Sequence, residues 1–225
     1  MNVSLFPAES EAALYLSALE DIHLVISETL SKYEFCRIAL AGGGTPKPLY
    51  EAMARAELPW DRLEFTLIDE RYVPSDHKES NLRMIRRALF NKVALPPDQI
   101  LFFDTSLAYE ECAKEMTRRL KAKQVERKPL FDLLILGAGA DGHVASLFGP
   151  EDLDASLART SHAENYPSQK RVSLGLGALS LATQAMLLLK GSSKKALLDA
   201  LTGPSQSTPV EVLVQRMPTK VHFYL

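Results

Sequence analysis

The feature that most constrains the fold is the alternation of short apolar segments with longer segments of helical periodicity. The apolar segments lack the polar alternation of a half-exposed strand, and such runs are typical of parallel strands buried on both faces. The predicted strands are Phe35–Ala41, Leu63–Ile68, Ile100–Phe103, Phe131–Leu136, Val172–Leu176, Ala185–Leu189 and Val221–Leu225. The predicted helices are Ala8–Lys32, Pro46–Ala56, Asn81–Phe90, Leu107–Lys123 and Ser192–Leu201. This rhythm predicts an α/β fold, a mostly parallel sheet with helices on both faces.

Composition and charge narrow the class of protein. Apolar residues make up 46% of the 225 residues, enough for the core of one domain, which we expect to span residues 1–225. The segments with least periodicity, Val73–Ser80, Gly149–Gln169 and Gly203–Thr208, are too short to separate domains. The 26 Lys and Arg nearly balance the 28 Asp and Glu, so no overall attraction to nucleic acid is expected.

The sequence also indicates where the protein works. No apolar run reaches the ~18 residues of a membrane span, and Met1–Glu11 lacks the basic start of a signal peptide. We therefore expect a cytoplasmic protein, a monomer or small homo-oligomer, with neither nucleic-acid nor membrane partners.

A glycine-rich segment, Gly42-Gly43-Gly44-Thr45-Pro46, lies between a predicted strand and a predicted helix. Ligands of open α/β sheets bind beyond the carboxyl ends of the strands. Glycines allow a ligand to approach the backbone closely, and backbone N–H groups there suit a phosphate. The alternative is a tight turn in which Thr45 caps the helix.

A second polar cluster, Asp69-Glu70-Arg71, directly follows the strand Leu63–Ile68. An arginine in this place can bind a phosphate or carboxylate through two hydrogen bonds, with one of the acids orienting it. A structural ion pair at the edge of the sheet is the alternative.

The segment Gly137–His143 (GAGADGH) follows the most apolar strand and contains a formal GxGxxG. Asp141 would place a negative charge beside a pyrophosphate, so we do not interpret the segment as a dinucleotide site. An aspartate two residues before a histidine instead offers an acid–base pair, in which Asp141 orients and stabilises the His143 ring. The alternative for His143 is a hydrogen-bonded core residue.

Basic residues late in the chain indicate a further anion-binding position. Arg171 precedes a strand, and Lys194 and Lys195 begin a helix, where a cation opposes the helix dipole unless an anion is bound. Lys195 is expected to be a solvated surface residue.

A metal site is not expected from the sequence. No histidines or cysteines have metal-ligand spacing, and Cys36 and Cys112 are expected to be buried thiols.

In these blocks the sequence resembles the 6-phosphogluconolactonase family, which is related to glucosamine-6-phosphate isomerases. The matching blocks are AGGGTPKPLYEAMA (41–54), LIDERYVPSDHKESNLRMIRRALF (67–90), FDLLILGAGADGHVASLFGP (131–150) and the region 171–201. The resemblance implies a modified Rossmann-like fold of the sugar-phosphate isomerase/deaminase type and no cofactor. It also implies that His143 is the catalytic base, with further site residues around the substrate: Asp69, Glu70, Arg71, Asn81, Asp141, Arg171 and Lys194. The family often has Ser, Trp and Thr where this chain has Gly44, Tyr72 and Val144.

The function that this resemblance implies is hydrolysis of 6-phospho-D-glucono-1,5-lactone, a step of the oxidative pentose phosphate pathway, by water that His143 activates. The phosphate would contact Gly43, Gly44 and Thr45 together with Arg171 and Lys194. Two alternatives stay open. A glucosamine-6-phosphate deaminase usually has a glutamate shortly after the histidine and a tyrosine at the Arg71 position, and both are absent here. A non-catalytic sugar-phosphate sensor would not need the Asp141/His143 pair.

Overall fold

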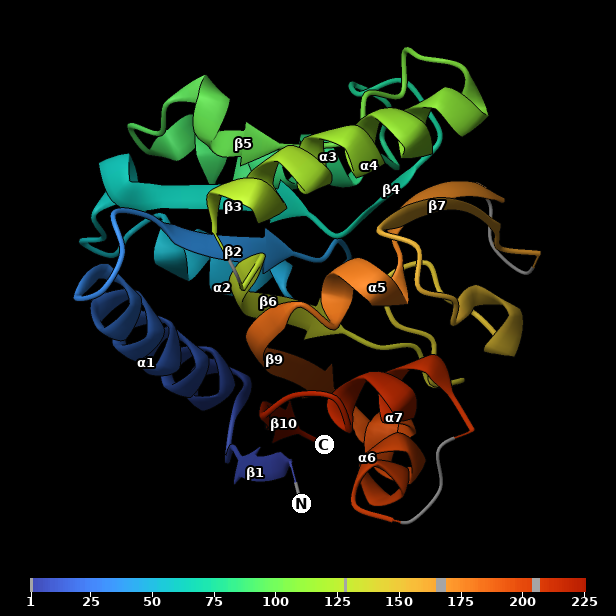
Figure 1. Cartoon of the computed structure of the whole chain (residues 1–225). Helices are drawn as coiled ribbons and strands as arrows, with labels where there is room; N and C mark the ends of the chain where they lie inside the picture. The colour runs from blue at the N-terminus through green and yellow to red at the C-terminus, as the bar shows by residue number, and fades with distance from the viewer. Residues whose placement is uncertain (1, 128, 165–168, 204–206) are drawn as a thin grey trace.

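The computed structural model describes residues 2–127, 129–164, 169–203 and 207–225. Its centre is a seven-stranded sheet in which every neighbouring pair is parallel (Figure 1). The strand order is β1 (Val3–Pro7), β10 (Thr219–Tyr224), β9 (Ala182–Lys190), β6 (Phe131–Gly137), β2 (Cys36–Leu40), β3 (Leu63–Leu67) and β5 (Ile100–Leu101). The predicted parallel sheet is confirmed.

Helices cover both faces of this sheet. The core on one face is formed with α1 (Glu11–Leu30), α2 (Lys47–Met53) and α3 (Asn81–Ala88). The core on the other face is formed with α4 (Tyr109–Glu126), α5 (Leu176–Leu179), α6 (Lys195–Leu201) and α7 (Pro209–Val214) (Figure 1). Short 3₁₀ turns lie at Trp60–Arg62, Phe90–Lys92, Pro97–Gln99, Pro150–Asp152 and Ser192–Lys194.

The central strands β2 and β6 are apolar at most positions because each contributes to both cores. Successive side chains of a strand point to opposite faces. Ile38 therefore packs in the core with α1–α3, while Ala39 packs in the core with α4–α7. In β6, Leu133 likewise packs in the core with α1–α3, and Leu134 packs in the core with α4–α7.

The middle of the sheet is a topological switch point. β2 and β6 are neighbours, but β2 is followed in the sheet by β3 on one side, and β6 by β9 on the other. A crevice forms where the connections leave two neighbouring strands in opposite directions, and ligands of open α/β sheets bind there. The segments after β2 and β6 are the glycine-rich segment 42–46 and the segment 138–143.

A small antiparallel sheet lies beside this crevice. Its strand order is β4 (Asp69–Arg71), β8 (Lys170–Leu174) and β7 (Ala158–His162). Ile68 joins β3 to β4, and its carbonyl accepts a hydrogen bond from the Leu174 amide at 2.8 Å. The small sheet therefore carries residues from the middle of the chain to the edge of the crevice.

Several details differ from the sequence prediction. The strands β1, β4 and β7 and the helix α7 were not predicted, and His162, expected in a loop, ends β7. Thr45 does not cap α2, because residues 44–46 form a turn and Pro46 takes the cap position. The predicted loops Gly149–Gln169 and Gly203–Thr208 include residues 165–168 and 204–206, which lie outside the described residues.

Candidate active site

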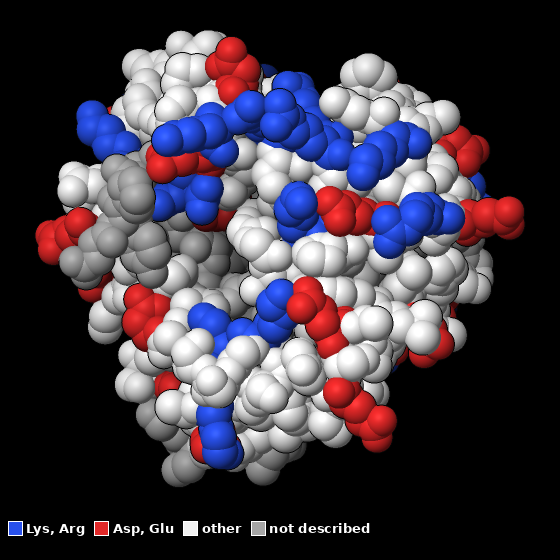
Figure 2. Space-filling model, turned by 180° about the vertical axis from the view of Figure 1, so that it is seen from behind, with Lys and Arg blue, Asp and Glu red and all other residues white. Residues whose placement is uncertain are grey.

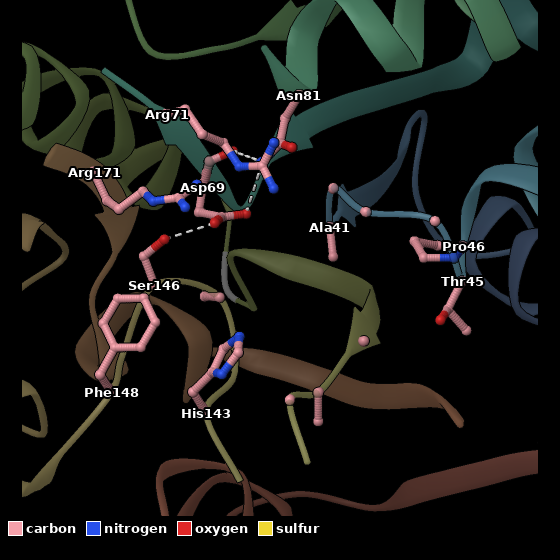
Figure 3. Close-up of a pocket in the computed structure, with 17 residues that line it drawn as sticks. Ala41, Thr45, Pro46, Asp69, Arg71, Asn81, His143, Ser146, Phe148 and Arg171 are labelled. Carbon is pink, nitrogen blue, oxygen red and sulfur yellow. Dashed lines mark hydrogen bonds between the residues drawn. The ribbon is translucent and has the colours of Figure 1, made fainter. Parts of the chain in front are cut away.

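A cavity of about 250 Å³ opens at the switch point (Figure 3). It lies between the segments that follow β2 and β6 and the small sheet. The lining residues are Ala41, Gly42, Gly43, Gly44, Thr45, Pro46, Asp69, Arg71, Asn81, Gly137, Ala138, Gly139, His143, Ala145, Ser146, Phe148 and Arg171. Of the predicted site residues, Glu70, Asp141 and Lys194 are not in this lining.

The glycine-rich segment forms one wall with its backbone. In the described part of the chain, the amides of residues 42–45 donate to no protein acceptor. Gly43 has a φ of +98°, and a Cβ on Gly42 would lie 2.0 Å from Asn81 Oδ1, so both positions favour glycine. Tyr15 donates its hydroxyl to the Thr45 carbonyl at 2.8 Å. The amides are therefore available to an anion in the cavity.

Two arginines form the opposite wall. Arg71 of β4 and Arg171 of β8 are directly paired across the small sheet, and in Figure 3 both lie beside Asp69. Like charges in such a pair destabilise a sheet. Arg171 is only 5% exposed, and its pKa is lowered by burial and by the charge of Arg71, against the opposing effect of Asp69. A bound anion would relieve this repulsion.

Asp69 is the centre of a hydrogen-bond network between the small sheet and the segment after β6. Ser146 donates its hydroxyl to Asp69 Oδ2 at 2.7 Å, and Asn81 Nδ2 donates to Oδ1 at 3.2 Å (Figure 3). The preceding residue, Ala145, has a φ of +56°, unusual for a residue with a side chain. The sequence analysis did not identify Ser146 as an Asp69 partner, because 77 residues separate the two.

Glu70 is buried behind the cavity. Its carboxylate accepts hydrogen bonds from the amides of Arg71, Asn81 and Leu82, at 2.7–2.8 Å, and from the Ser80 hydroxyl. Burial raises the pKa of Glu70, although these hydrogen bonds oppose the shift. In this structure Glu70 ties the first turn of α3 to β4 and thereby holds Asn81 at the cavity.

His143 lies across the cavity from the arginines (Figure 3). Its Nδ1 is 2.7 Å from Asp141 Oδ1. The centre of its ring lies 5.1 Å from the centre of the Phe148 ring, so the two rings pack together. Burial would raise the pKa of Asp141, but the charge of His143 and its hydrogen bonds outweigh burial and lower it. Asp141 is therefore ionised near neutral pH and holds the ring by Nδ1.

The turn that carries His143 depends on two glycines. A Cβ on Gly139 would lie 2.1 Å from Asp141 Oδ1 and 2.2 Å from His143 Nδ1. Gly142 has a φ of +82°, and its carbonyl accepts the Val210 amide of α7 at 3.1 Å. The pair Asp141–His143 is thus fixed by the backbone on both sides.

Lys194 lies beside this turn. Its ammonium donates to the Ala138 carbonyl at 2.7 Å, and burial lowers its pKa although Asp141 opposes the shift. A role of Lys194 at the phosphate stays a prediction. Lys195, by contrast, is exposed, as predicted, and it forms an ion pair with Asp199.

The two cysteines do not line the cavity. Cys36 and Cys112 are buried, as predicted. Among the residues with described positions, no three His, Cys, Asp or Glu side chains gather where they could bind a metal ion. Within the same part of the chain, no helix combines the length and the apolar character of a transmembrane span.

Comparison with known proteins decides the family. The family model described as Glucosamine-6-phosphate isomerases/6-phosphogluconolactonase matches residues 9–222. The chain belongs to this family. It is 33% identical over 208 residues to a 6-phosphogluconolactonase of Thermotoga maritima, covering 92% of this chain and 91% of that protein. It is 39% identical over 171 residues to a 6-phosphogluconolactonase of Synechocystis, covering 74% of this chain and 71% of that protein.

The fold of the family is also found here. A crystal structure of 6-phosphogluconolactonase from Thermotoga maritima superimposes with a TM-score of 0.88 at 31% identity, covering 98% of both chains. The resemblance to the 6-phosphogluconolactonase family and the predicted sugar-phosphate isomerase/deaminase type of fold are confirmed.

Proposed function

We propose that this chain is a 6-phosphogluconolactonase, which hydrolyses 6-phospho-D-glucono-1,5-lactone to 6-phospho-D-gluconate in the oxidative pentose phosphate pathway. The observation that carries the proposal is the chemistry of the cavity walls. His143 lines the cavity and is held by Asp141, which lies outside the lining, and the anion-binding side is formed by the Arg71–Arg171 pair and the amides of residues 42–45. The names of the relatives support this substrate.

The anion-binding side would hold the phosphate. The amides of Gly43, Gly44 and Thr45 supply hydrogen bonds that need no side-chain reorganisation, and Arg171 supplies charge. Arg71 lies beside Arg171 and faces either the phosphate or the lactone oxygens. Asp69 and Asn81 line the same wall and suit the sugar hydroxyls, because carboxylate and amide oxygens accept hydrogen bonds from them.

The reaction requires a proton acceptor near the lactone carbonyl. With Nδ1 held by Asp141, the neutral His143 ring presents Nε2 as its basic atom. Nε2 takes a proton from water as the water oxygen bonds to C1. The tetrahedral intermediate then collapses, the bond from C1 to the ring oxygen breaks, and the imidazolium returns the proton to that oxygen. Asp141 stabilises the imidazolium between the two steps.

This scheme needs neither a cofactor nor a metal ion, since the leaving group is an alkoxide that His143 protonates. The residues after His143 are Val144, Ala145 and Ser146. They contain no carboxylate that could assist a deaminase reaction, which favours the lactonase. We further propose that the enzyme works in the cytoplasm on a small-molecule substrate, as a monomer or small homo-oligomer.

The test is hydrolysis of freshly generated 6-phosphogluconolactone near neutral pH, with spontaneous hydrolysis subtracted. Glucosamine 6-phosphate serves as the parallel substrate. We expect turnover of the lactone and no ammonia from the amino sugar. Ammonia release without lactone hydrolysis would assign the deaminase function, and binding of 6-phosphogluconate without either reaction would assign the sensor.

A further inference from the structure

The exposed side of α3 is strongly basic. The helix has the sequence NLRMIRRA, with three arginines and no acidic residue. Asn81, Leu82, Ile85 and Ala88 are buried, Arg83 and Arg86 are half-buried, and Arg87 is exposed. Residues three or four apart share a helix face, so Arg83, Arg86 and Arg87 form one cationic surface, here called the α3 arginine face.

Ion pairs do not account for this surface. In the described part of the chain, Arg83 and Arg87 make no side-chain ion pair or hydrogen bond, and the Arg86 guanidinium lies 5.6 Å from the centre of the Phe102 ring. Arg86 and Arg87 lie in the last turn of α3, where the helix dipole favours a cation, whereas Arg83 in the first turn opposes the dipole. Like charges at this spacing also repel one another. The charge of the α3 arginine face is thus not balanced by local ion pairs, in a chain whose net charge is −2.

The α3 arginine face adjoins the candidate active site. α3 begins with Asn81, which lines the cavity, and Arg71 donates from Nη1 to the carbonyl of Glu79, two residues before α3. Figure 2 shows Lys and Arg gathered in a band over α3, along the upper side of a hollow in that face of the molecule. The first turn of α3 thus lies beside the cavity that Arg71 and Arg171 line.

We propose that the α3 arginine face captures the phosphorylated substrate electrostatically before it enters the cavity. The inference rests on the proposed function, which supplies a substrate carrying a phosphate dianion. A cluster of one sign at the mouth of a cleft raises the local concentration of the opposite charge and accelerates association. This effect weakens steeply as ionic strength rises, because the screening length falls from ~10 Å at 0.1 M salt to ~3 Å at 1 M.

The test compares kcat/KM for the phosphorylated lactone in the wild type and in the double variant Arg83→Gln/Arg87→Gln, at 20 mM and 500 mM salt. We expect the variant to lose about three- to tenfold in kcat/KM at 20 mM salt, at or below the lower end of the ~10–10³-fold range for electrostatic steering, because only two charges are removed. The loss should shrink below about twofold at 500 mM, with kcat unchanged. Unphosphorylated gluconolactone should show no difference between the two proteins at either salt concentration.

The matched control is Lys32→Gln/Lys121→Gln, which removes the same charge from exposed positions at the end of α1 and on α4. Calorimetric Kd values for 6-phosphogluconate, measured at the same salt concentrations, test capture without turnover and separate it from failure of the proposed reaction. Capture by the α3 arginine face is refuted by equal losses in the control, by losses that persist at 500 mM salt, or by no change in both kcat/KM and Kd.

Discussion

Replacing Gly139 by alanine tests the proposed catalytic role of the Asp141–His143 contact with one methyl group. The added Cβ would lie 2.1 Å from Asp141 Oδ1, 2.2 Å from His143 Nδ1 and 2.3 Å from His143 Cε1. Ordinary contacts begin near ~3.5 Å, so the two side chains must retreat by roughly an ångström. A misplacement of about 1 Å at a reacting group can cost ~10²-fold in rate. We therefore expect Gly139→Ala to lower kcat/KM by about 10²-fold or more.

The fold should tolerate this change. The φ of Gly139 lies outside the left-handed region, and the groups that the methyl meets are side chains near the cavity rather than backbone. The substitution also reduces the entropy of the unfolded chain, which stabilises by ~0.4–1 kcal/mol where the native backbone permits alanine. The assay is steady-state hydrolysis of the phosphorylated lactone, with Tm measured on the same preparation.

The matched control is Gly203→Ala, outside the cavity lining, where the nearest atom to an added Cβ would be the Ala200 carbonyl oxygen at 3.4 Å, an ordinary contact. We expect this variant to change kcat/KM by less than about threefold. A Gly139→Ala enzyme with wild-type kcat/KM and wild-type Tm would refute the assignment of the Asp141–His143 contact as the catalytic arrangement.

Four further predictions follow from the site and its surroundings. His143→Asn should lower kcat by ~10²–10⁴-fold, the usual contribution of general acid–base catalysis, while the Kd of 6-phosphogluconate stays within about threefold; a wild-type kcat would remove His143 from the mechanism. Arg171→Ala should raise KM far more for the phosphorylated lactone than for gluconolactone, and equal effects would place Arg171 away from the phosphate. Activity should survive exhaustive chelation, whereas loss on EDTA treatment that one divalent ion reverses would reveal a metal site. Finally, burial lowers the pKa of His222 from 6.5 although Asp21, 2.9 Å from Nε2, opposes the shift. The folded state thus binds fewer protons than the unfolded state, so stability should fall as the pH drops below ~6.5. Urea unfolding of His222→Gln at pH 5.5 and 7.5 should show a smaller pH dependence than the wild type.

The main sheet, apart from its edge strand β1, was predictable from sequence because its strands carry their own signal. The run FDLLIL is apolar at nearly every position since β6 is buried on both faces. The strands β4 and β7 carry no such signal. Their sequences, DER and ARTSH, are polar, and they become strands by pairing with β8, which for Arg71 means a partner 100 residues away.

In the candidate site, too, some features have a local sequence signal and others depend on contacts between distant parts of the chain. The segments 42–46 and 137–143 could be predicted as ligand-binding because glycines and polar residues follow apolar strands, and the structure brings both to one cavity. Asp69 and Arg71 line the cavity, whereas Glu70 between them points to the other face of β4 and accepts hydrogen bonds from the start of α3. The contact from Ser146 to Asp69 likewise depends on the left-handed backbone of Ala145, which a sequence of small residues does not specify.

The two halves of the cavity are built on separate supports. Arg71 and Arg171 belong to the small antiparallel sheet, whereas His143 follows a strand of the main sheet, and Ile68 with its bond to Leu174 joins the supports. Under the proposed function, the relative position of the two supports sets the distance between the arginines that hold the phosphate and His143, the base. A lactone with a shorter chain between phosphate and carbonyl would satisfy one end only. Selectivity for chain length can thus change through residues at this joint while the acid–base pair stays as it is.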